Sequence, residues 1–472
     1  MIAFGFCSLH DKFTTAEKSM NKKILSLAVA AAMVVPGAAM AEAILYGKLN
    51  VSLDYANVKN VVLPEYAFAE DANGDVILDA NGNPTLVKTA PGQDFDGWGM
   101  SGNGYIPGAG RASRIGVKGS EDLGNGLKAI YQVELGINLN DSNNNVLSNS
   151  DSITYRNTFI GLAGDWGTAL IGRHDTPMKI STGKLDLFSD TMADYNGTVG
   201  FRDLRADNVL AYISPSLAGF QLMGAIIPAG GATGGGQGLN LNEDSLAGAY
   251  SLAGIYSNGP FYGSVAYESL GNQHFNSQSV SLTGNNCPVV VPLDPNDPNS
   301  AFESSCAYTD DDSTAWRIGL GLLDWNGFTL TGIFEKREHE FPSGRYEAFT
   351  NPADGSFNTF FPDGPDEIEL WQIQAGYAFG NSMVKAMYGQ ADYSSDYSFG
   401  PSAVAEAGGA LAGSNVSDFY SRNIETWGIG FDHNLSKRTK AYALYTAVDS
   451  DAKDVISRSQ WDGFSVGMIH SF

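Results

Sequence analysis

The sequence predicts an all-β chain that folds as a transmembrane antiparallel β-barrel of 16 strands. Three observations support this fold class. After residue 41 no run of 18 or more apolar residues occurs, which excludes a bundle of membrane-spanning helices. No long segment has the 3.6-residue period of an amphipathic helix. Many short segments alternate instead between large and small residues, in a chain with 56 Gly, 25 Phe and 21 Tyr.

The first 41 residues have the order of an export signal. Lys22 and Lys23 precede an apolar stretch from Ile24 to Val35, and Ala39–Ala41 supplies a small-residue cleavage site. A buried or membrane-spanning helix is the alternative, but the stretch is short for a span. We therefore expect an upstream extension over residues 1–19, a signal peptide over 20–41 and a single barrel domain over 42–472.

The charge balance narrows the partners. The chain has 52 acidic and 28 basic side chains, a net charge of −24. Nucleic acid requires clustered Lys and Arg, so we expect no nucleic-acid partner. The negative net charge also excludes a basic protein that binds membrane surfaces.

Cysteine usage agrees with export. Cys287 and Cys306 follow the signal and flank a stretch rich in Asp, Asn and Pro. In an oxidising compartment we expect them to form one loop-closing disulfide, and two free thiols are the alternative. No Cys/His cluster has the spacing of a zinc site, so we expect neither a metal nor a cofactor.

The end of the chain contains the clearest strand. Every second residue from Phe464 to Phe472 is large and mostly apolar, whereas the residues between them are mostly small. The same alternation recurs in residues 371–379 and 427–433. Alternate residues of a strand face opposite sides, so one face suits lipid and the other a lumen.

Turn signals divide the chain into strands of this kind. Asn326-Gly327 and Gly380-Asn381 mark short turns at one end, while the connections at the other end are long and polar. Outer-membrane barrels have this asymmetry, and 16 strands enclose a water-filled channel. The expected strands are 44–56, 112–120, 127–138, 153–164, 167–175, 207–215, 219–227, 244–257, 260–271, 312–325, 327–338, 366–379, 381–393, 422–436, 438–449 and 460–472.

Several motifs within these strands resemble the general porins of Gram-negative outer membranes. They are Leu45–Leu49, Ser113–Lys128, Phe159–Ala163, Gly172–Pro177, Arg205–Pro215, Asn434–Thr439 and the terminal Phe472. The resemblance covers the chain after the signal. It implies a homotrimer of 16-stranded barrels, each with a channel for passive diffusion of ions and small hydrophilic solutes. Outer-membrane lipid and lipopolysaccharide would surround the trimer.

The resemblance also implies that the third outer loop, from about His174 to Asp203, folds inward and narrows the channel. At roughly 30 residues this loop is too long for a plain hairpin connection. Asp186 and Asp190 match the acidic positions of the family's loop, and Asp194 is a third acidic candidate for the constriction. The alternative is that these aspartates are ordinary loop residues or helix N-caps.

The opposite wall of such a channel is basic. The resemblance assigns this wall to Lys48, Arg114, Arg156 and Arg205. Exposure of an Arg or Lys to lipid would cost about 2–4 kcal/mol at mid-bilayer, so we expect these side chains to face the lumen. They could also anchor the loop through salt bridges.

The charge of the opening is less defined. The loop mixes Lys179 and Lys184 with its acids, and Arg173 and Arg202 are further basic candidates. From the negative charge of the outer loops we expect a weak cation preference.

Other functions have weaker support. Gly463–Gly467 matches a nucleophile elbow but lacks the following helix, and the six histidines are scattered, so we expect no enzyme. Residues 71–75 and 79–83 are spaced like calcium ligands, but no glutamate closes a loop, so Asn-Gly turns are expected. The long loops would also permit a role as an adhesin or phage receptor.

Overall fold

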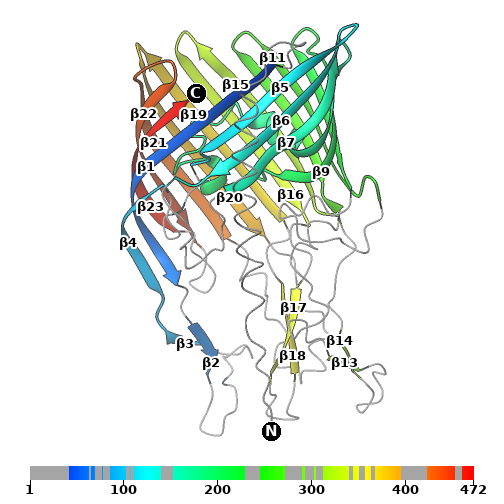
Figure 1. Ribbon diagram of the computed structural model, residues 1–472. Helices are drawn as coiled ribbons and strands as arrows, with labels where there is room; N and C mark the ends of the chain where they lie inside the picture. The colour runs from blue at the N-terminus through cyan, green and yellow to red at the C-terminus, as the bar shows by residue number, and fades with distance from the viewer. Residues whose placement is uncertain are drawn as a thin grey trace, which may run out of the picture.

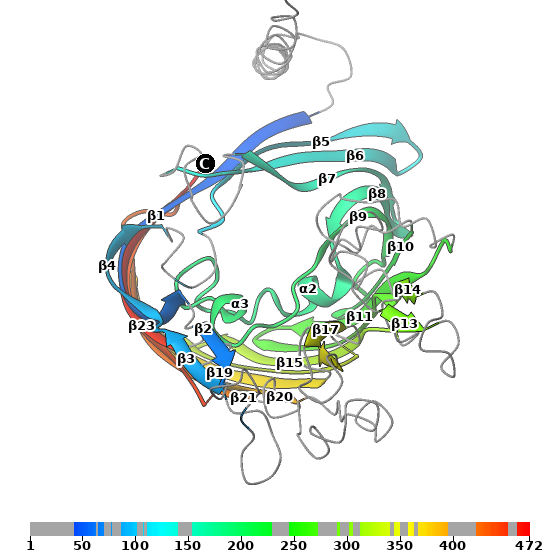
Figure 2. The same cartoon turned by 90° about the horizontal axis from the view of Figure 1, so that it is seen from below.

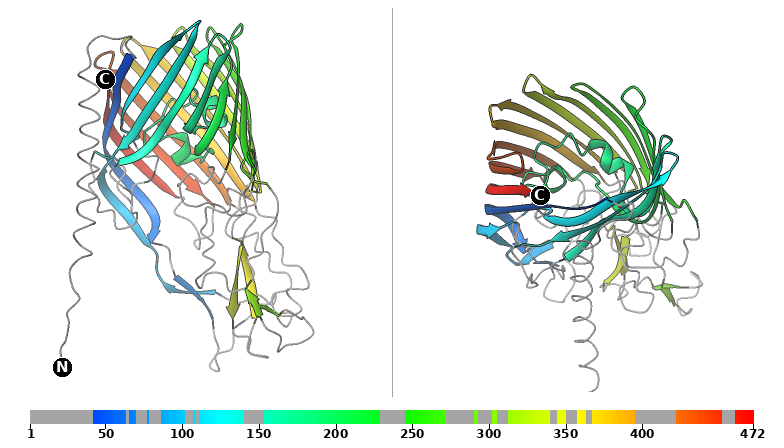
Figure 3. Two further views of the ribbon diagram at one scale, coloured as in Figure 1. Left: turned by 45° about the vertical axis from the view of Figure 1, so that its right-hand side comes forward. Right: turned by 45° about the horizontal axis from the view of Figure 1, so that its top comes forward.

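In the computed structural model of the protein, strands surround a central lumen, and short turns join them at one end (Figures 1 and 3). The structure describes residues 42–62, 65–69, 77, 86–101, 107, 111–139, 153–228, 245–271, 290–292, 302–304, 312–339, 344–349, 357–362, 367–394, 422–451 and 460–472. The expected signal peptide, the Cys287–Cys306 disulfide and the Asn-Gly repeats of residues 71–83 lie outside these residues.

Sixteen antiparallel strands close into a barrel. Each pairs with its neighbours around the ring, and β1 closes it by pairing with β23, with Leu49 opposite His470. The predicted 16-stranded antiparallel barrel is confirmed. The strands are β1 (Glu42–Val62), β5 (Arg114–Gly124), β6 (Leu127–Ile137), β7 (Ile153–Gly164), β8 (Gly167–Asp175), β9 (Arg205–Ile213), β10 (Phe220–Ile227), β11 (Ala249–Asn258), β12 (Phe261–Ser269), β15 (Thr314–Trp325), β16 (Phe328–Glu338), β19 (Glu367–Phe379), β20 (Ser382–Ser394), β21 (Arg422–Asn434), β22 (Thr439–Ser450) and β23 (Trp461–Ser471).

One strand of the sheet was not predicted. β4 (Gln93–Met100) pairs with the second half of β1, whereas β5 pairs with its first seven residues. β1 therefore extends beyond its predicted end at residue 56, because β4 supplies partners for its backbone groups. Short hairpins also form in the loops: β2 (Glu65–Phe68) with β3 (Leu86–Ala90), β13 (Val290–Pro292) with β14 (Phe302–Ser304), and β17 (Gly344–Phe349) with β18 (Phe357–Pro362).

The outer face carries aromatic rings near both ends of the strands. Toward the loops, Trp316 packs on Phe334, Trp371 on Tyr388 and Trp427 on Tyr445, at 5.1, 5.6 and 5.3 Å between ring centroids. Toward the short turns, Trp166 packs on Tyr212, Phe220 on Tyr256 and Phe328 on Tyr377, at 6.1, 4.5 and 4.5 Å. Two aromatic girdles flanking an apolar band are typical of a barrel in a bilayer.

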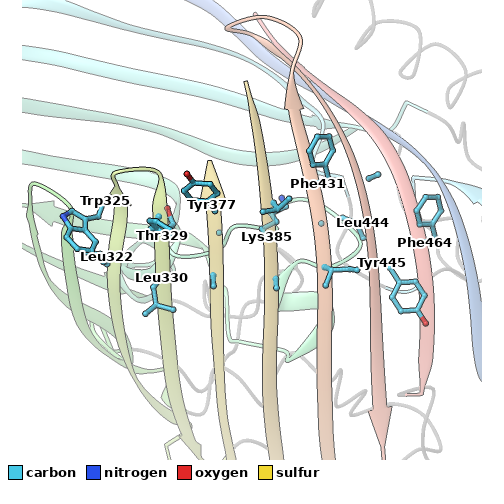
Figure 4. Close-up of a pocket in the computed structure, with 18 residues that line it drawn as sticks. Leu322, Trp325, Thr329, Leu330, Tyr377, Lys385, Phe431, Leu444, Tyr445 and Phe464 are labelled. Atoms are coloured by element: carbon cyan, nitrogen blue, oxygen red, sulfur yellow. The ribbon is translucent and has the colours of Figure 1, made fainter. Parts of the chain in front are cut away.

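The band between the girdles is apolar. Over β15–β23 it is hollowed into a shallow cavity of about 940 Å³, lined by side chains such as Leu330, Tyr377 and Phe464 (Figure 4). Among the described residues, no helix is long and apolar enough to cross a membrane.

The main hydrophobic core lies inside the barrel. The loop between β8 and β9 contains α2 (Pro177–Thr182) and α3 (Tyr195–Thr198), and both lie within the ring of strands (Figure 2). The loop buries Leu185, Phe188 and Met192 completely in one cluster with residues of the wall. The predicted inward-folded third loop is confirmed.

Glycines on the wall make room for this loop. A Cβ atom added to Gly319 or Gly321 of β15 would lie 2.6 or 2.7 Å from a methyl carbon of Leu185. One added to Gly430 of β21 would lie 2.9 Å from the ring of Phe188. The small inward face that the sequence shows on these strands therefore accommodates the loop by close approach.

Candidate functional site: the constriction of the lumen

The third loop crosses the lumen from β8 to β1. At its base, the amide of Thr176 donates to the carbonyl oxygen of Leu204 at 3.1 Å. At its tip, the side chain of Asn50 on β1 donates to the carbonyl oxygen of Asp190 at 2.6 Å. The loop packs on β12, β16 and β19–β23. Strands β5–β9 lie across the lumen from it (Figure 2), and we refer to the side of the lumen between them as the opening.

The structure separates the three candidate acids of the loop. Asp190 lies at the tip, adopts a left-handed backbone with φ of 60°, and is partly exposed. Asp186 is buried, and its carboxylate accepts from the amide of Phe188 and from Gln374, both at 2.9 Å. Asp194 is also buried and caps α3. The structure therefore brings Asp190 to the basic wall and places Asp186 and Asp194 inside the loop.

Asp194 connects the cap to the tip. Its Oδ1 accepts from the amide of Asn196 at 2.9 Å, and its Oδ2 accepts from the amide of Asp190 at 2.7 Å. An Asp side chain at this position satisfies amides that the first helical turn leaves unpaired. Asp194 is therefore the N-cap of α3, which is the alternative that the sequence left open for these aspartates.

Two basic residues meet the tip of the loop. The Lys48 ammonium lies 2.5 Å from Oδ2 of Asp190, and Nη1 of Arg114 lies 3.7 Å from the same oxygen. Arg114 also approaches Glu134 of β6, with 3.7 Å between its Nε and the carboxylate. On the next strand, Nε of Arg156 donates to Glu134 at 2.6 Å.

The ion pairs continue around the opening to the base of the loop. Arg205 lies 2.9 Å from the carboxylate of Asp175, and its Nε donates to Asn157 at 2.7 Å. Lys179 of α2 lies 3.2 Å from the same carboxylate. Asn157, which accepts from Arg205, directly follows Arg156 on β7, so the two groups of charges are adjacent.

We call this set the constriction ring. It contains five cations and three carboxylates, so its excess is two positive charges. Each side chain lies on an element facing the opening. The members are Lys48, Arg114, Arg156, Lys179, Arg205, Glu134, Asp175 and Asp190.

Sequence reasoning missed two carboxylates of the ring. Glu134 shares its parity with the polar residues Lys128 and Gln132, a signal that could have placed it in the lumen. Asp175 ends β8, where strand parity is disturbed by a register shift between Gly172 and His174. Alternation alone could not orient it.

The two further basic candidates make other contacts. Arg173 forms an ion pair with Asp207. Arg202 lies at the end of the loop, where its side chain donates to Ser313 at 2.7 Å and its amide donates to Glu335 at 2.9 Å. Neither residue forms an ion pair with a carboxylate of the ring among the described contacts.

A buried ion pair anchors the end of the loop to the opposite wall. Nε of Arg317 on β15 donates to Glu335 of β16 at 2.5 Å, and both side chains are fully buried. Arg317 also contacts Asp203 of the loop at 3.0 Å and donates to the carbonyl oxygen of Arg202 at 2.5 Å. Arg337 completes the group by donating to Glu335 at 2.6 Å and to the carbonyl oxygen of Gly200.

The buried acids make the loop sensitive to pH. Burial raises the pKa of Asp186 and of Asp194, and the charge of Asp186 raises the pKa of Asp194 further. Hydrogen bonds from Gln374 and from backbone amides, and the charge of Lys385, oppose the rise at Asp186. Asp190 adds to the rise at Asp194.

We expect the loop to be held more firmly at pH 5 than at pH 9. Both folded-state pKa values lie above the unfolded value of about 3.9, so protonation favours the folded loop. This contribution is lost as the pH rises through the raised values. Open-channel current noise should therefore increase between pH 5 and pH 9, and Asp194→Asn should weaken the increase. Greater noise at pH 5 would contradict the assignment.

Comparison with known proteins places the chain in a family. The family model described as Gram-negative porin matches residues 28–453. The major outer membrane protein P.IB of Neisseria meningitidis is 30% identical over 201 residues, which are 42% of this chain and 47% of that protein. An outer membrane porin protein of Bordetella pertussis is 34% identical over 140 residues, 29% of this chain and 36% of that protein. The matches thus span about half, or less, of the length of these curated relatives.

A solved structure agrees on the fold. The anion-selective porin from Comamonas acidovorans aligns with a TM-score of 0.51 and 18% identity, covering 92% of this chain and 100% of that one. The relatives are named as outer-membrane proteins, and this chain is an outer-membrane protein as well. With a family model that matches residues 28–453, and a barrel of the matching architecture, the chain belongs to the Gram-negative porin family.

Proposed function

We propose that the protein is a passive diffusion channel of the outer membrane, which admits ions and small hydrophilic solutes. The observation that carries this function is the constriction ring, a set of charged side chains inside a barrel whose outer face is apolar. Channels sort solutes by the width of the passage and by charges at close range. We assign the protein no catalytic role.

The net positive charge of the constriction ring favours anions. The sequence led us to expect a weak cation preference from the acidic outer loops, but charges within a few ångströms of the path act more strongly than screened charges at the mouth. Five cations against three carboxylates leave an excess of two positive charges in the constriction ring. We therefore propose a preference for anions.

The partners are part of the proposal. The relatives form the family of outer-membrane porins, and the family resemblance implies a homotrimer. Outer-membrane lipid would cover the apolar band between the two aromatic girdles, and lipopolysaccharide would face its loop end. An adhesin or phage-receptor role has no specific observation in its favour.

Current measurements in a planar lipid bilayer test both the channel activity and the preference for anions. Purified full-length protein should produce stepwise ohmic conductance in multiples of three. In a potassium chloride gradient, the reversal potential should have the sign of anion permeation. Absence of conductance would overturn the channel, and a reversal potential of the opposite sign would overturn the anion preference.

A further inference from the structure

We propose that Glu134 is the positioning residue of the constriction ring, which holds Arg114 and Arg156 side by side and limits the preference for anions. This inference rests on the proposed channel function. It concerns a side chain that the opening barely exposes, with 9% of its side-chain surface accessible against 26% for Arg114 and 19% for Arg156. Glu134 therefore lies behind the two guanidinium groups that line the path.

Both oxygens of Glu134 are engaged. Oε1 accepts from Nε of Arg156 at 2.6 Å. Oε2 accepts from the hydroxyl of Tyr46 at 2.9 Å and lies 3.7 Å from Nε of Arg114. The contacts use the Nε side of each guanidinium, so one carboxylate on β6 bridges cations of β5 and β7, the strands on either side of it. Without the carboxylate, the two cations would repel each other across the same gap.

The backbone aims these side chains at one another. Between Val133 and Leu135 of β6 the register with β7 shifts, so that Glu134 alone faces two residues, Arg156 and Asn157. This is the geometry of a β-bulge, which can re-aim a side chain. It allows consecutive residues of β7 to serve the ring, since Arg156 reaches Glu134 while Asn157 accepts from Arg205.

A glycine makes room for Tyr46 beside the carboxylate. Gly116 lies between Tyr46 and Glu134 on the strand that separates them, and a Cβ there would be 2.6 Å from the tyrosine ring. At Gly136, which faces Arg114, a Cβ would be 2.5 Å from Oγ1 of Thr154 but in ordinary contact, at 3.4 Å, with Cδ of Arg156. The ring of Tyr46 therefore lies across a position without a side chain.

The charge of Glu134 has a predictable effect on permeation. It offsets one of the five cations, so its removal raises the excess of the constriction ring from two to three positive charges. The added positive excess attracts anions and repels cations, so both effects raise the anion-to-cation permeability ratio. The arginines would also lose the group that fixes their spacing.

The test uses the full-length channel with Glu134→Gln in planar bilayers. We expect the anion-to-cation permeability ratio to rise roughly threefold or more, with increased open-channel noise. Glu134→Asp keeps the charge and should retain a ratio near that of the unaltered protein. Glu121→Gln is the matched control, since this exposed acid lies about 17 Å along β5 from Gly116, the residue paired with Glu134, and it should leave the ratio unchanged.

A double variant keeps the inference testable if Glu134→Gln fails to fold. Glu134→Gln with Arg156→Gln removes one charge of each sign, so its ratio should be close to that of the unaltered protein and above that of Arg156→Gln alone. A conducting Glu134→Gln channel with an unchanged ratio would overturn the role of Glu134 and leave the channel function standing. A double variant no different from Arg156→Gln alone would overturn it as well. Absence of conductance in the unaltered protein would instead overturn the proposed channel function.

Discussion

Replacement of Glu335 by alanine is expected to release the constriction loop and widen the channel. Glu335 and Arg317 are fully buried and in contact, and Glu335 also accepts from the amide of Arg202 at the end of the loop. Removing one partner of a buried ion pair typically costs about 3–5 kcal/mol, because the other charge is left without compensation. Arg317 contacts Asp203 and the carbonyl oxygen of Arg202, both at the end of the loop. The change should therefore weaken the attachment of the loop to the wall.

The barrel should survive this change. Its strands are joined by backbone pairing, which Glu335→Ala leaves intact. We expect a larger single-channel conductance and faster entry of large sugars into proteoliposomes. Glu338→Ala is the matched control, since Glu338 lies on the same strand with an exposed side chain paired to Lys336. Conductance and sugar entry that match the control would show that this pair does not hold the loop.

Reversal of ion preference is the second large effect. Arg114, Arg156 and Arg205 together supply three of the five positive charges of the ring. Their simultaneous replacement by glutamine leaves two cations against three carboxylates, an excess of one negative charge. Since charges at a constriction act on ions at a few ångströms, we expect the channel to change from anion to cation preference.

A charge-conserving control separates charge from shape. The triple replacement of the same arginines by lysine keeps the excess of two positive charges but loses the planar guanidinium groups. It should retain the anion preference, as measured by reversal potential in the same salt gradient. If the glutamine variant still favours anions, charges outside the ring dominate selection.

The local sequence pattern was sufficient to predict most strands of the barrel. The strands predicted at 153–164 and 167–175 coincide with β7 and β8, because side-chain alternation and the turn between them are local properties. β4 could not be found this way. β4 and the end of β1 supply backbone partners to each other beyond the residues that β5 pairs, and this pairing is a long-range condition.

The constriction was predictable in part. The basic residues Lys48, Arg114, Arg156 and Arg205 were identified from strand position and family resemblance, and the structure brings all four to the opening. The loop acids are a different case, since their spacing in the sequence carries no information on which way each carboxylate points.

The sequence by itself determined the barrel class and its number of strands, because these follow from alternation and turns, and its family resemblance implied the inward loop. Only the tertiary structure decided that Asp190 faces the basic wall while Asp186 and Asp194 turn inward, and that Glu134 joins two arginines. The physical reason is that these side chains are oriented by partners on distant strands. Charge at the opening is therefore a property of the assembled ring, which the net charge of the chain does not predict.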